Sequence, residues 1–361
     1  MAHSLKARIS IVLLVFAAVS LQAFAQSGRM RGQSAPRNQI DRDSVRLRVE
    51  EVLLPIRVRG DYGKLTAPLR RSDLIVTEDG KRRQVNDVIS TPANVLFILD
   101  AGGERTIKHT SAHRDLALKM ISSMAEGDRA AILTYADSVD VLSSWTADKA
   151  ALRHALQTRF KPGIRSRFYD SLLYAADELL PRVAGRRSVV IIGDGIETVN
   201  TLGFEKVLAA LHRARAIVYA ACPNEILLTA IKPTAYNAMS WYEMLDPGAR
   251  KRIQALRTYY HQLEAGEVTL KGLAEETGGA CWAPTTEDEL KSLGQGIVGE
   301  IGTEYVIAYS SERPSGDEAF HPVKVYTTQP GVQVQARRGI YSNSNEQYAT
   351  GDLKPGKPPN R

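Results

Sequence analysis

The sequence predicts an α/β fold with a doubly wound, mostly parallel sheet, because two apolar segments end in aspartate and helical segments lie between the strands. Residues 94–100 read Asn-Val-Leu-Phe-Ile-Leu-Asp, and residues 188–194 read Ser-Val-Val-Ile-Ile-Gly-Asp. Runs without polar alternation are typical of central strands in a parallel sheet that carries helices on both faces. Strand and helix patterns alternate from residue 91 onward, which is the order expected of a doubly wound domain.

This expected domain covers residues 91–303, and its elements follow from apolar periodicity and from end signals. One helix stops near Gly127 and another before Pro181, because glycine and proline end helices. Thr146 is the expected N-cap of a third helix. The expected strands are 94–100, 130–135, 139–142, 188–194, 216–222 and 278–282. The expected helices are 113–125, 148–160, 169–180, 204–215, 270–277 and 287–301.

An insertion over about residues 223–266 interrupts the alternation, and its second half, 248–263, has a helical pattern. The insertion is rich in aromatic residues. Such residues are more often packed locally than presented to a ligand, and a binding face is the alternative. They are Trp241, Tyr242, Tyr259 and Tyr260.

The first segment of the chain predicts export. Residues 1–25 carry Lys6 and Arg8 before an apolar run and end in Ala-Phe-Ala, which indicates a secretory signal peptide cleaved before Gln26. An uncleaved anchor is the alternative, although the run is short for a membrane span. Residues 26–43 are polar without periodicity and predict a flexible linker. We therefore expect the mature chain in the periplasm or the extracellular space, with no transmembrane segment.

β-strand patterns flank the α/β domain on both sides. Residues 44–90 predict a β module of about four strands, in which Asp-Gly at 79–80 forms a hairpin turn. The strand segments expected on either side of this turn are 74–76 and 85–89. Residues 304–342 predict strands that join or pack on the core, and residues 343–361 predict a disordered tail.

The composition is that of a soluble globular protein. The 361 residues are 43% hydrophobic and 24% charged, with a formal net charge of +7. Removal of the predicted signal peptide leaves 45 basic and 40 acidic residues, a charge of +5. This surplus is modest and no nucleic-acid-binding motif accompanies it, so we expect no nucleic-acid partner.

Basic residues cluster in the β module. The ordinary interpretation is a solvated strand surface, and the alternative is weak contact with an anionic envelope surface such as lipid headgroups or polysaccharide. The cluster consists of Arg70, Arg71, Lys81, Arg82 and Arg83.

The cysteines and two histidines give weaker signals. Cys222 and Cys281 each end an apolar strand pattern, and either a disulfide or two buried thiols is compatible with that placement. His109 and His113 are four residues apart, but without a further ligand we expect exposed polar residues rather than a zinc site.

The two strand-end aspartates define the candidate site. Ligands of open α/β sheets bind at the carboxyl ends of the strands, so Asp100 and Asp194 are expected at one edge. Asp100 is followed by Ala-Gly-Gly-Glu, which ends at Glu104. Ser166 precedes the helix that begins near Tyr169.

This order of residues resembles the von Willebrand factor type A (vWA) domain, whose metal-ion-dependent adhesion site uses Asp-x-Ser-x-Ser, a later Thr and a later Asp. Asp100 and Asp194 match the two aspartates, and Ser166 stands where the threonine usually does. Over roughly residues 44–342 the chain also resembles the acidobacterial-type VWFA-related proteins. The segments that carry this resemblance are Glu-Asp-Gly-Lys at 78–81, the Asp-Gly strand end, Leu-Ala-Glu-Glu-Thr-Gly-Gly at 273–279 and the closing Tyr-Val-Ile-Ala-Tyr and Arg-Arg-Gly-Ile-Tyr segments. These are exported bacterial proteins without an established general activity. The resemblance implies a protein-interaction role and a divalent-cation site.

The chain departs from the adhesion motif because Gly102 and Glu104 occupy the two serine positions, and glycine has no side-chain oxygen. The degenerate candidate metal site consists of Asp100, Glu104, Ser166 and Asp194. In one interpretation these residues hold Mg²⁺ or Ca²⁺, and Ca²⁺ tolerates such a site better. In the other, which we favour, no cation binds and nearby arginines balance the carboxylates.

The sequence favours a binding function over catalysis. There is no P-loop and no Gly-x-Gly-x-x-Gly fingerprint, and Ser166 does not lie in a Gly-x-Ser-x-Gly turn. We therefore expect a non-enzymatic protein that mediates protein–protein interaction or scaffolding through the strand-end rim. The alternatives are a cell-envelope hydrolase that uses rim carboxylates and a structural envelope component held by the basic β surface.

Overall fold

The computed structural model describes residues 47–60, 68–103, 110–199, 202–236, 246–314 and 319–341. All of them lie in one compact unit, which spans Arg46–Arg361. The predicted signal peptide, linker and C-terminal tail lie outside the described residues, as do Glu104, His109, Trp241 and Tyr242.

A six-stranded sheet forms the centre of the unit, with strand order β10-β9-β8-β5-β6-β7. All neighbouring strands are parallel except β6 and β7, which are antiparallel. Every residue of β5 is buried, because helices cover both faces of the sheet. The predicted fold class is confirmed. The strands are β5 (Ala93–Asp100), β6 (Arg129–Tyr135), β7 (Val139–Thr146), β8 (Arg186–Ile192), β9 (Ile217–Ala221) and β10 (Ala280–Trp282).

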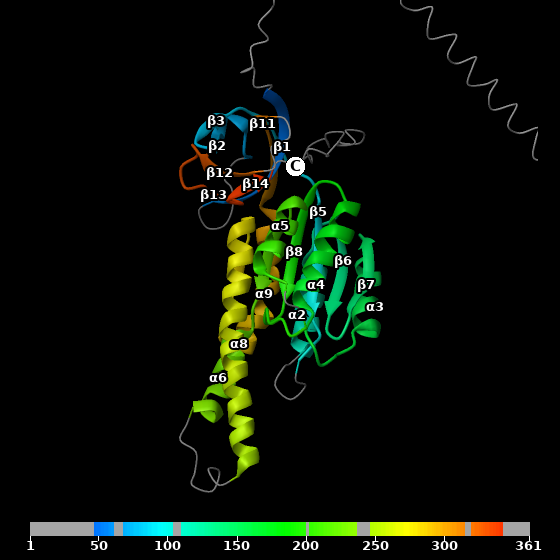
Figure 1. Ribbon diagram of the computed structural model, residues 1–361. Helices are drawn as coiled ribbons and strands as arrows, with labels where there is room; N and C mark the ends of the chain where they lie inside the picture. The colour runs from blue at the N-terminus through cyan, green and yellow to red at the C-terminus, as the bar shows by residue number, and fades with distance from the viewer. Residues whose placement is uncertain are drawn as a thin grey trace, which may run out of the picture. The chain divides into compact units, whose positions relative to one another are not determined.

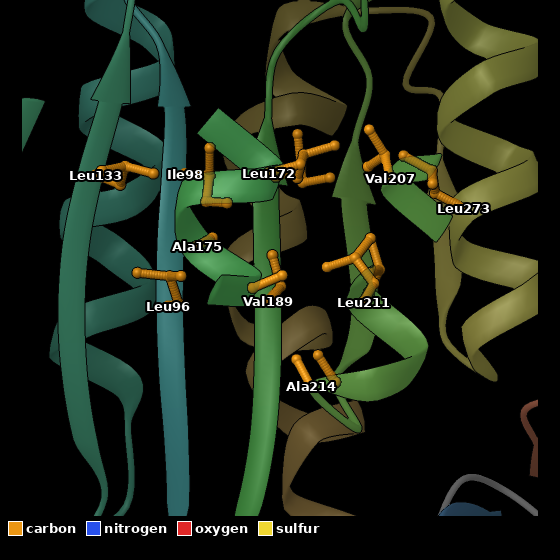
Figure 2. Close-up of a cluster of buried hydrophobic side chains, with 14 of the residues drawn as sticks. Leu96, Ile98, Leu133, Leu172, Ala175, Val189, Val207, Leu211, Ala214 and Leu273 are labelled. Carbon is orange, nitrogen blue, oxygen red and sulfur yellow. The ribbon is translucent and has the colours of Figure 1, made fainter. Parts of the chain in front are cut away.

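Helices pack against the central sheet (Figure 1), and each face of the sheet has its own hydrophobic cluster. One face carries α2 (Thr110–Ser123), α3 (Lys149–Arg159) and α9 (Glu287–Gly302). The other face carries α4 (Phe168–Tyr174), α5 (Phe204–Arg213) and α8 (Pro247–Thr277). Figure 2 shows this second face, where Leu96 and Ile98 of β5 and Val189 of β8 lie opposite helical leucines. Alternate residues of each strand therefore supply the two cores.

Several helix boundaries differ from the sequence predictions. The N-cap of α3 is Asp148, whose Oδ1 accepts hydrogen bonds from the backbone of Ala150 and Ala151, so the prediction of Thr146 was wrong. The helix predicted over 169–180 is divided into three consecutive segments of different helical type. They are α4, a π-helical segment η3 (Ala175–Leu179) and a 3-10 turn η4 (Leu180–Arg182). Pro181 lies at the start of η4, where its missing N–H breaks no internal bond.

The largest difference concerns the insertion. Its second half and the helix predicted over 270–277 are one helix, the 31-residue α8. It packs beside α6 (Asn224–Tyr236), and together they form a helical arm (Figure 1). We call this pair the α6–α8 arm. In the described part of the chain, no helix combines the length and apolar character needed to cross a bilayer.

The strands at the two ends of the chain form one β module. One sheet has the order β13-β1-β11-β4 and the other β14-β12-β2-β3, so each contains strands from both ends. A single hydrophobic cluster lies between them. The bounds are β1 (Leu47–Arg59), β2 (Leu74–Glu78), β3 (Lys81–Arg83), β4 (Val85–Ile89), β11 (Glu304–Pro314), β12 (Phe320–Thr327), β13 (Gln333–Ala336) and β14 (Gly339–Tyr341), with a short 3-10 turn η2 (Arg71–Asp73) before β2.

The predicted hairpin turn at Asp79-Gly80 is present, and both residues have positive φ, 53° and 75°. The strand that follows the turn in the hairpin is β3, however, and not residues 85–89. Those residues form β4, which pairs with β11 in the other sheet. Two adjacent short strands thus belong to different sheets, a division that local periodicity does not reveal.

A buried polar network joins the module to the base of the central sheet. The Glu304 carboxylate at the start of β11 accepts hydrogen bonds from the Ser188 hydroxyl at 2.9 Å and the Tyr219 hydroxyl at 2.7 Å. Arg186 Nη1 donates to the Glu304 carbonyl oxygen at 2.7 Å. Burial raises the pKa of Glu304, while the Arg186 charge opposes the shift.

Candidate functional site

Asp100 and Asp194 lie at the same edge of the central sheet, as predicted. β5 and β8 are parallel neighbours, with Leu99 opposite Ile192 at the last paired position. Both aspartates are fully buried. Gly193 lies so close to Asp100 that a Cβ on it would be 2.6 Å from the Asp100 Cβ. The two strand ends are therefore in direct contact.

Tyr135 is a third member of this edge that sequence reasoning missed. It ends β6 and lies opposite Asp100 in the parallel register. Its hydroxyl would be 2.6 Å from a Cβ on Gly193, and it has no hydrogen-bond partner among the described residues. Burial raises the pKa of Tyr135 well above its usual value, and the charges of Asp100 and Asp194 raise it further. The phenol is therefore neutral at the strand ends.

Each aspartate turns one carboxylate oxygen back onto its own loop. Asp100 Oδ1 accepts a hydrogen bond from the Gly102 N–H at 2.8 Å, and Asp194 Oδ1 accepts one from the Ile196 N–H at 3.0 Å. Such Asx turns fix a loop immediately after a strand. The Asp100 carbonyl oxygen lies 3.0 Å from His113 Nδ1. His113 is buried, so the expectation of an exposed histidine was wrong.

Ser166 joins the loop before α4 to the loop after β8. Its hydroxyl donates a hydrogen bond to the Ile196 carbonyl oxygen at 2.7 Å. Its backbone N–H donates to Thr198 Oγ1 at 2.7 Å, and the Thr198 N–H donates to the Ser166 carbonyl oxygen at 3.0 Å. Ser166 is thus held close to the Asp194 loop, but its hydroxyl proton is already used in a loop–loop contact.

Backbone atoms fill the space beside Gly102. A Cβ on residue 102 would lie 1.9 Å from the Arg165 carbonyl oxygen. The Gly103 N–H donates to the Ile164 carbonyl oxygen at 3.0 Å, and the Gly163 N–H donates to the Ala101 carbonyl oxygen at 2.8 Å. The Asp137 carboxylate accepts from the backbone N–H groups of Ile164 and Arg165, which holds the loop in place. A serine at position 102 therefore does not fit this arrangement.

We use the name strand-end rim for the loops 100–103, 163–167 and 194–198. Within the rim, the structure brings together Asp100, Ser166 and Asp194, while Glu104 lies outside the described residues. The described residues lack one of the side-chain oxygens of the adhesion motif, because one serine position is Gly102 and the Arg165 backbone occupies the space beside it. The Ser166 hydroxyl donates its proton to the Ile196 carbonyl oxygen.

A different group of metal-type side chains lies in the β module. Glu78, Asp79 and His321 each offer a ligand atom within 4.8 Å of the others. Glu78 Oε1 accepts a hydrogen bond from the Ser311 hydroxyl at 2.8 Å, and its Oε2 lies 3.5 Å from Arg83 Nε. His321 Nδ1 lies 2.8 Å from Asp79 Oδ2. These contacts fasten the hairpin to β11 through Ser311 and to β12 through His321.

The α6–α8 arm is attached to the rim at Asp194. Asn224 Nδ2 donates hydrogen bonds to the carbonyl oxygens of Asp194 at 2.9 Å and Leu263 at 2.7 Å. Ile196 packs in one hydrophobic cluster with Leu263 and residues of α6. The base of the arm is therefore part of the same structure as the Asp194 loop.

The outer part of the arm carries an aromatic cluster. The rings of Tyr236 and Tyr260 meet edge to face with centroids 5.1 Å apart, and the Arg257 guanidinium lies 5.6 Å from the centre of the Tyr236 ring. Tyr236 is one of the exposed large hydrophobic residues, and so is Ile164 of the rim, which is 78% exposed. The aromatic residues Tyr259 and Tyr260, in contrast, pack within the arm, as predicted for local packing.

The two cysteines are free thiols at two neighbouring strands, β9 and β10. Cys222 follows β9 and its backbone N–H donates to the Trp282 carbonyl oxygen at 2.8 Å, while Cys281 lies within β10. Burial raises the pKa of Cys281 to about 12 and raises that of Cys222 as well. Both groups are therefore poor thiolate nucleophiles.

Comparisons with known proteins agree with the central architecture. Residues 95–197 match the family model described as the von Willebrand factor type A domain. Among curated proteins, no sequence is significantly similar to this chain.

Solved structures that resemble the chain share little sequence with it. Proximal thread matrix protein 1 from the mussel byssus is 13% identical, with a TM-score of 0.43, over 63% of this chain and 50% of that protein. It has also been solved with zinc in its metal-ion-dependent adhesion site motif. An aerotolerance-related membrane protein from Bacteroides fragilis is 14% identical, with a TM-score of 0.39, over 58% of this chain and 99% of that protein. A mutant of the PilB minor pilin from Streptococcus sanguinis is 12% identical, with a TM-score of 0.40, over 59% of this chain and 62% of the pilin. The chain thus spans about half the length of the mussel protein.

Proposed function

Residues 95–197 of this chain form a von Willebrand factor type A domain, and on that premise we propose that the protein is an exported interaction or scaffolding protein that binds a protein partner through its strand-end rim. The exposed side chain of Ile164 is the observation on which this proposal chiefly depends. Export rests on the predicted signal peptide at residues 1–25.

Ile164 combines exposure with a fixed backbone. Its side chain is 78% exposed, although its carbonyl oxygen and N–H are both bonded, to Gly103 and Asp137 respectively. A large aliphatic side chain on a well-anchored loop loses little conformational freedom when a partner covers it. A partner that covers this side chain removes its apolar surface from water, which favours binding.

The α6–α8 arm extends the same recognition face. It is attached beside Asp194 through Asn224, and its aromatic cluster presents Tyr236. Tyrosine and arginine are enriched at the centres of protein interfaces. We propose that a partner contacts the rim and the arm together, so that the arm determines which partner is selected.

Recognition is proposed to be independent of a cation. Gly102 leaves no room for the serine of the adhesion motif, so one of the motif's metal-binding oxygens is missing from the rim. A vWA domain that captures an acidic partner residue needs a metal with a free coordination position. This rim instead offers an aliphatic side chain and backbone-anchored loops, which suit an apolar contact.

Catalysis is the less favoured function. A hydrolase that acts on envelope polymers needs a cleft that encloses its substrate. Beside His113 the described residues form a hollow of only about 30 Å³, lined mainly by apolar residues from α2, α6 and α9. That volume corresponds to about one water molecule. We therefore propose that the rim binds its partner without catalysis.

Site-specific photocrosslinking in the native host tests this proposal. A photoreactive phenylalanine analogue replaces Ile164, and a matched variant carries it at Tyr326, which is 50% exposed on β12 of the module. We expect a discrete crosslinked protein adduct from position 164 and not from position 326. No adduct from position 164, or the same adduct from both positions, would refute a rim-specific partner.

A further inference from the structure

A basic hollow lies in the β module, and the rim does not account for it. It has a volume of about 410 Å³. Arg71 and Ser72 of η2 form one side, Arg82 and Arg83 of β3 form the other, and Leu74 and Val85 supply apolar surface. The cluster of basic residues recognised in the sequence is thus partly gathered around one concavity, and is not spread over a flat strand surface.

The charges of the three lining arginines are not equally balanced. Arg83 lies 3.5 Å from the Glu78 carboxylate and 3.3 Å from the Glu312 carboxylate, and its side chain is 8% exposed. Arg71 and Arg82 are exposed, and neither has an ion pair or a side-chain hydrogen bond with any residue that the structure describes. Within the described part of the chain, two guanidinium groups at the hollow are therefore available to an anion.

The acidic residue of η2, Asp73, forms hydrogen bonds with Arg70 and Gln329. Asp73 Oδ2 accepts hydrogen bonds from the Arg70 N–H at 2.9 Å and from Gln329 Nε2 at 2.7 Å. The backbone N–H of Arg70 holds the pKa of Asp73 below its usual value, so this carboxylate stays charged while it fixes the turn. Its contacts position η2 against the loop after β12, and among the described residues it pairs with neither Arg71 nor Arg82.

We propose that this hollow binds an acidic sugar unit of an anionic polysaccharide. Guanidinium groups form paired, charge-assisted hydrogen bonds with planar carboxylates and with the oxygens of phosphate or sulfate. Leu74 and Val85 add the apolar surface that the C–H face of a sugar ring needs, and the volume lies within the range of small-ligand sites. A concave site suits a discrete ring better than the flat surface of a bilayer.

Binding of defined polymers to the purified protein tests this inference. The probes are polygalacturonate, which carries one carboxylate per sugar, neutral dextran, and vesicles that contain phosphatidylglycerol. Dissociation constants are measured at 50 and 150 mM NaCl for the wild type and for Arg82→Glu. Arg153→Glu, which makes the same charge change at an exposed position of α3, outside the β module, is the matched control.

We expect polygalacturonate to bind and dextran not to bind, with affinity that falls as salt increases. Arg82→Glu should weaken binding about tenfold or more, since a charge-assisted contact is lost and a repulsion is added. Arg153→Glu should change it less than about twofold. Equal losses in both variants would show unspecific charge attraction and refute the site, and binding to vesicles but not to polygalacturonate would replace it with membrane contact.

The inference is independent of the proposed rim function, and one further variant separates the two. Ile164→Asp alters the rim and leaves the hollow intact. It should retain polygalacturonate binding within about twofold, whatever the outcome of the crosslinking experiment. Loss of polysaccharide binding in Ile164→Asp would assign that binding to the rim and contradict the hollow.

Discussion

Gly266 of α8 lies against the backbone of Asp194, so closely that a Cβ on residue 266 would be 2.2 Å from the Asp194 carbonyl oxygen. The contact is reciprocal, because a Cβ on Gly195 would be 2.6 Å from the Gly266 carbonyl oxygen. A helix with any side chain at position 266 could not approach the strand end so closely. The α6–α8 arm is therefore built directly onto the rim.

Gly266→Ala should destabilise this junction. The added methyl group meets backbone atoms that cannot rotate away, and overpacking of this kind costs about 1–3 kcal/mol. We expect a lower free energy of unfolding in urea and faster proteolysis within the arm. Gly272→Ala in the same helix is the control, because its nearest neighbour is the end of the Phe204 ring at 3.2 Å, which has room to adjust. Equal stability of the two variants would contradict the proposed attachment.

Gly102→Ala should destabilise the rim itself. Its methyl group would collide with the Arg165 carbonyl oxygen, so loops 100–103 and 163–167 must separate, at a cost of about 1–3 kcal/mol. Gly299→Ala is the control, because nothing lies within 4 Å of that position in α9 and alanine favours a helix by about 1 kcal/mol. Denaturant unfolding should move in opposite directions for the two variants. A Gly102→Ala protein as stable as the wild type would show that the loop that carries Arg165 moves at little cost in free energy, and it would contradict this prediction.

Acid should weaken the contact between α5 and the C-terminal strands through His212. The ring is buried against Phe320 and Tyr341, with centroids 6.0 and 6.2 Å away. Burial and, to a smaller extent, the Arg337 charge lower the pKa of His212 to about 4, against a hydrogen bond with the Gly339 backbone that opposes the shift. Between pH 6.5 and pH 4 the unfolded chain therefore binds a proton that the folded chain does not.

The free energy of unfolding should consequently fall by about 2 kcal/mol from this group as the pH drops from 7 to 5. The His212→Gln variant should lose that part of the pH dependence, since glutamine does not titrate. His154→Gln, at an exposed position of α3, is the matched control. An unchanged pH dependence in His212→Gln would show that other groups control acid stability.

Local sequence patterns predicted the elements around the site but not the pairing of distant segments. The runs that end at Asp100 and Asp194 are unambiguous because continuous apolar strands have few alternatives. The union of strands from 47–89 and 304–341 into one module depends on contacts more than 200 residues apart, which no local period reports. The joint placement of Asp100 and Asp194 followed from a general rule of parallel sheets.

The errors at the site also have physical reasons. The gap predicted between two helices at 264–269 contains Gly266, and glycine weakens a helical pattern although here it permits the contact with Asp194. Tyr135 was missed because a tyrosine at a strand end usually indicates packing. The available sequence signal was that Tyr135 ends the predicted strand 130–135, as Asp100 ends its own strand. That Gly102 faces a backbone carbonyl depends on a loop 60 residues later, which a motif comparison does not include.

Calorimetric titration of the purified protein with Mg²⁺ and Ca²⁺ tests most directly the central claim, that this vWA rim works without a cation. Asp194→Asn is titrated in parallel, because it removes the charge at the strand end and keeps an oxygen for the Ile196 N–H. We predict no saturable heat at millimolar cation in either protein. Saturable binding in the wild type that disappears in Asp194→Asn would establish a metal site and contradict the account.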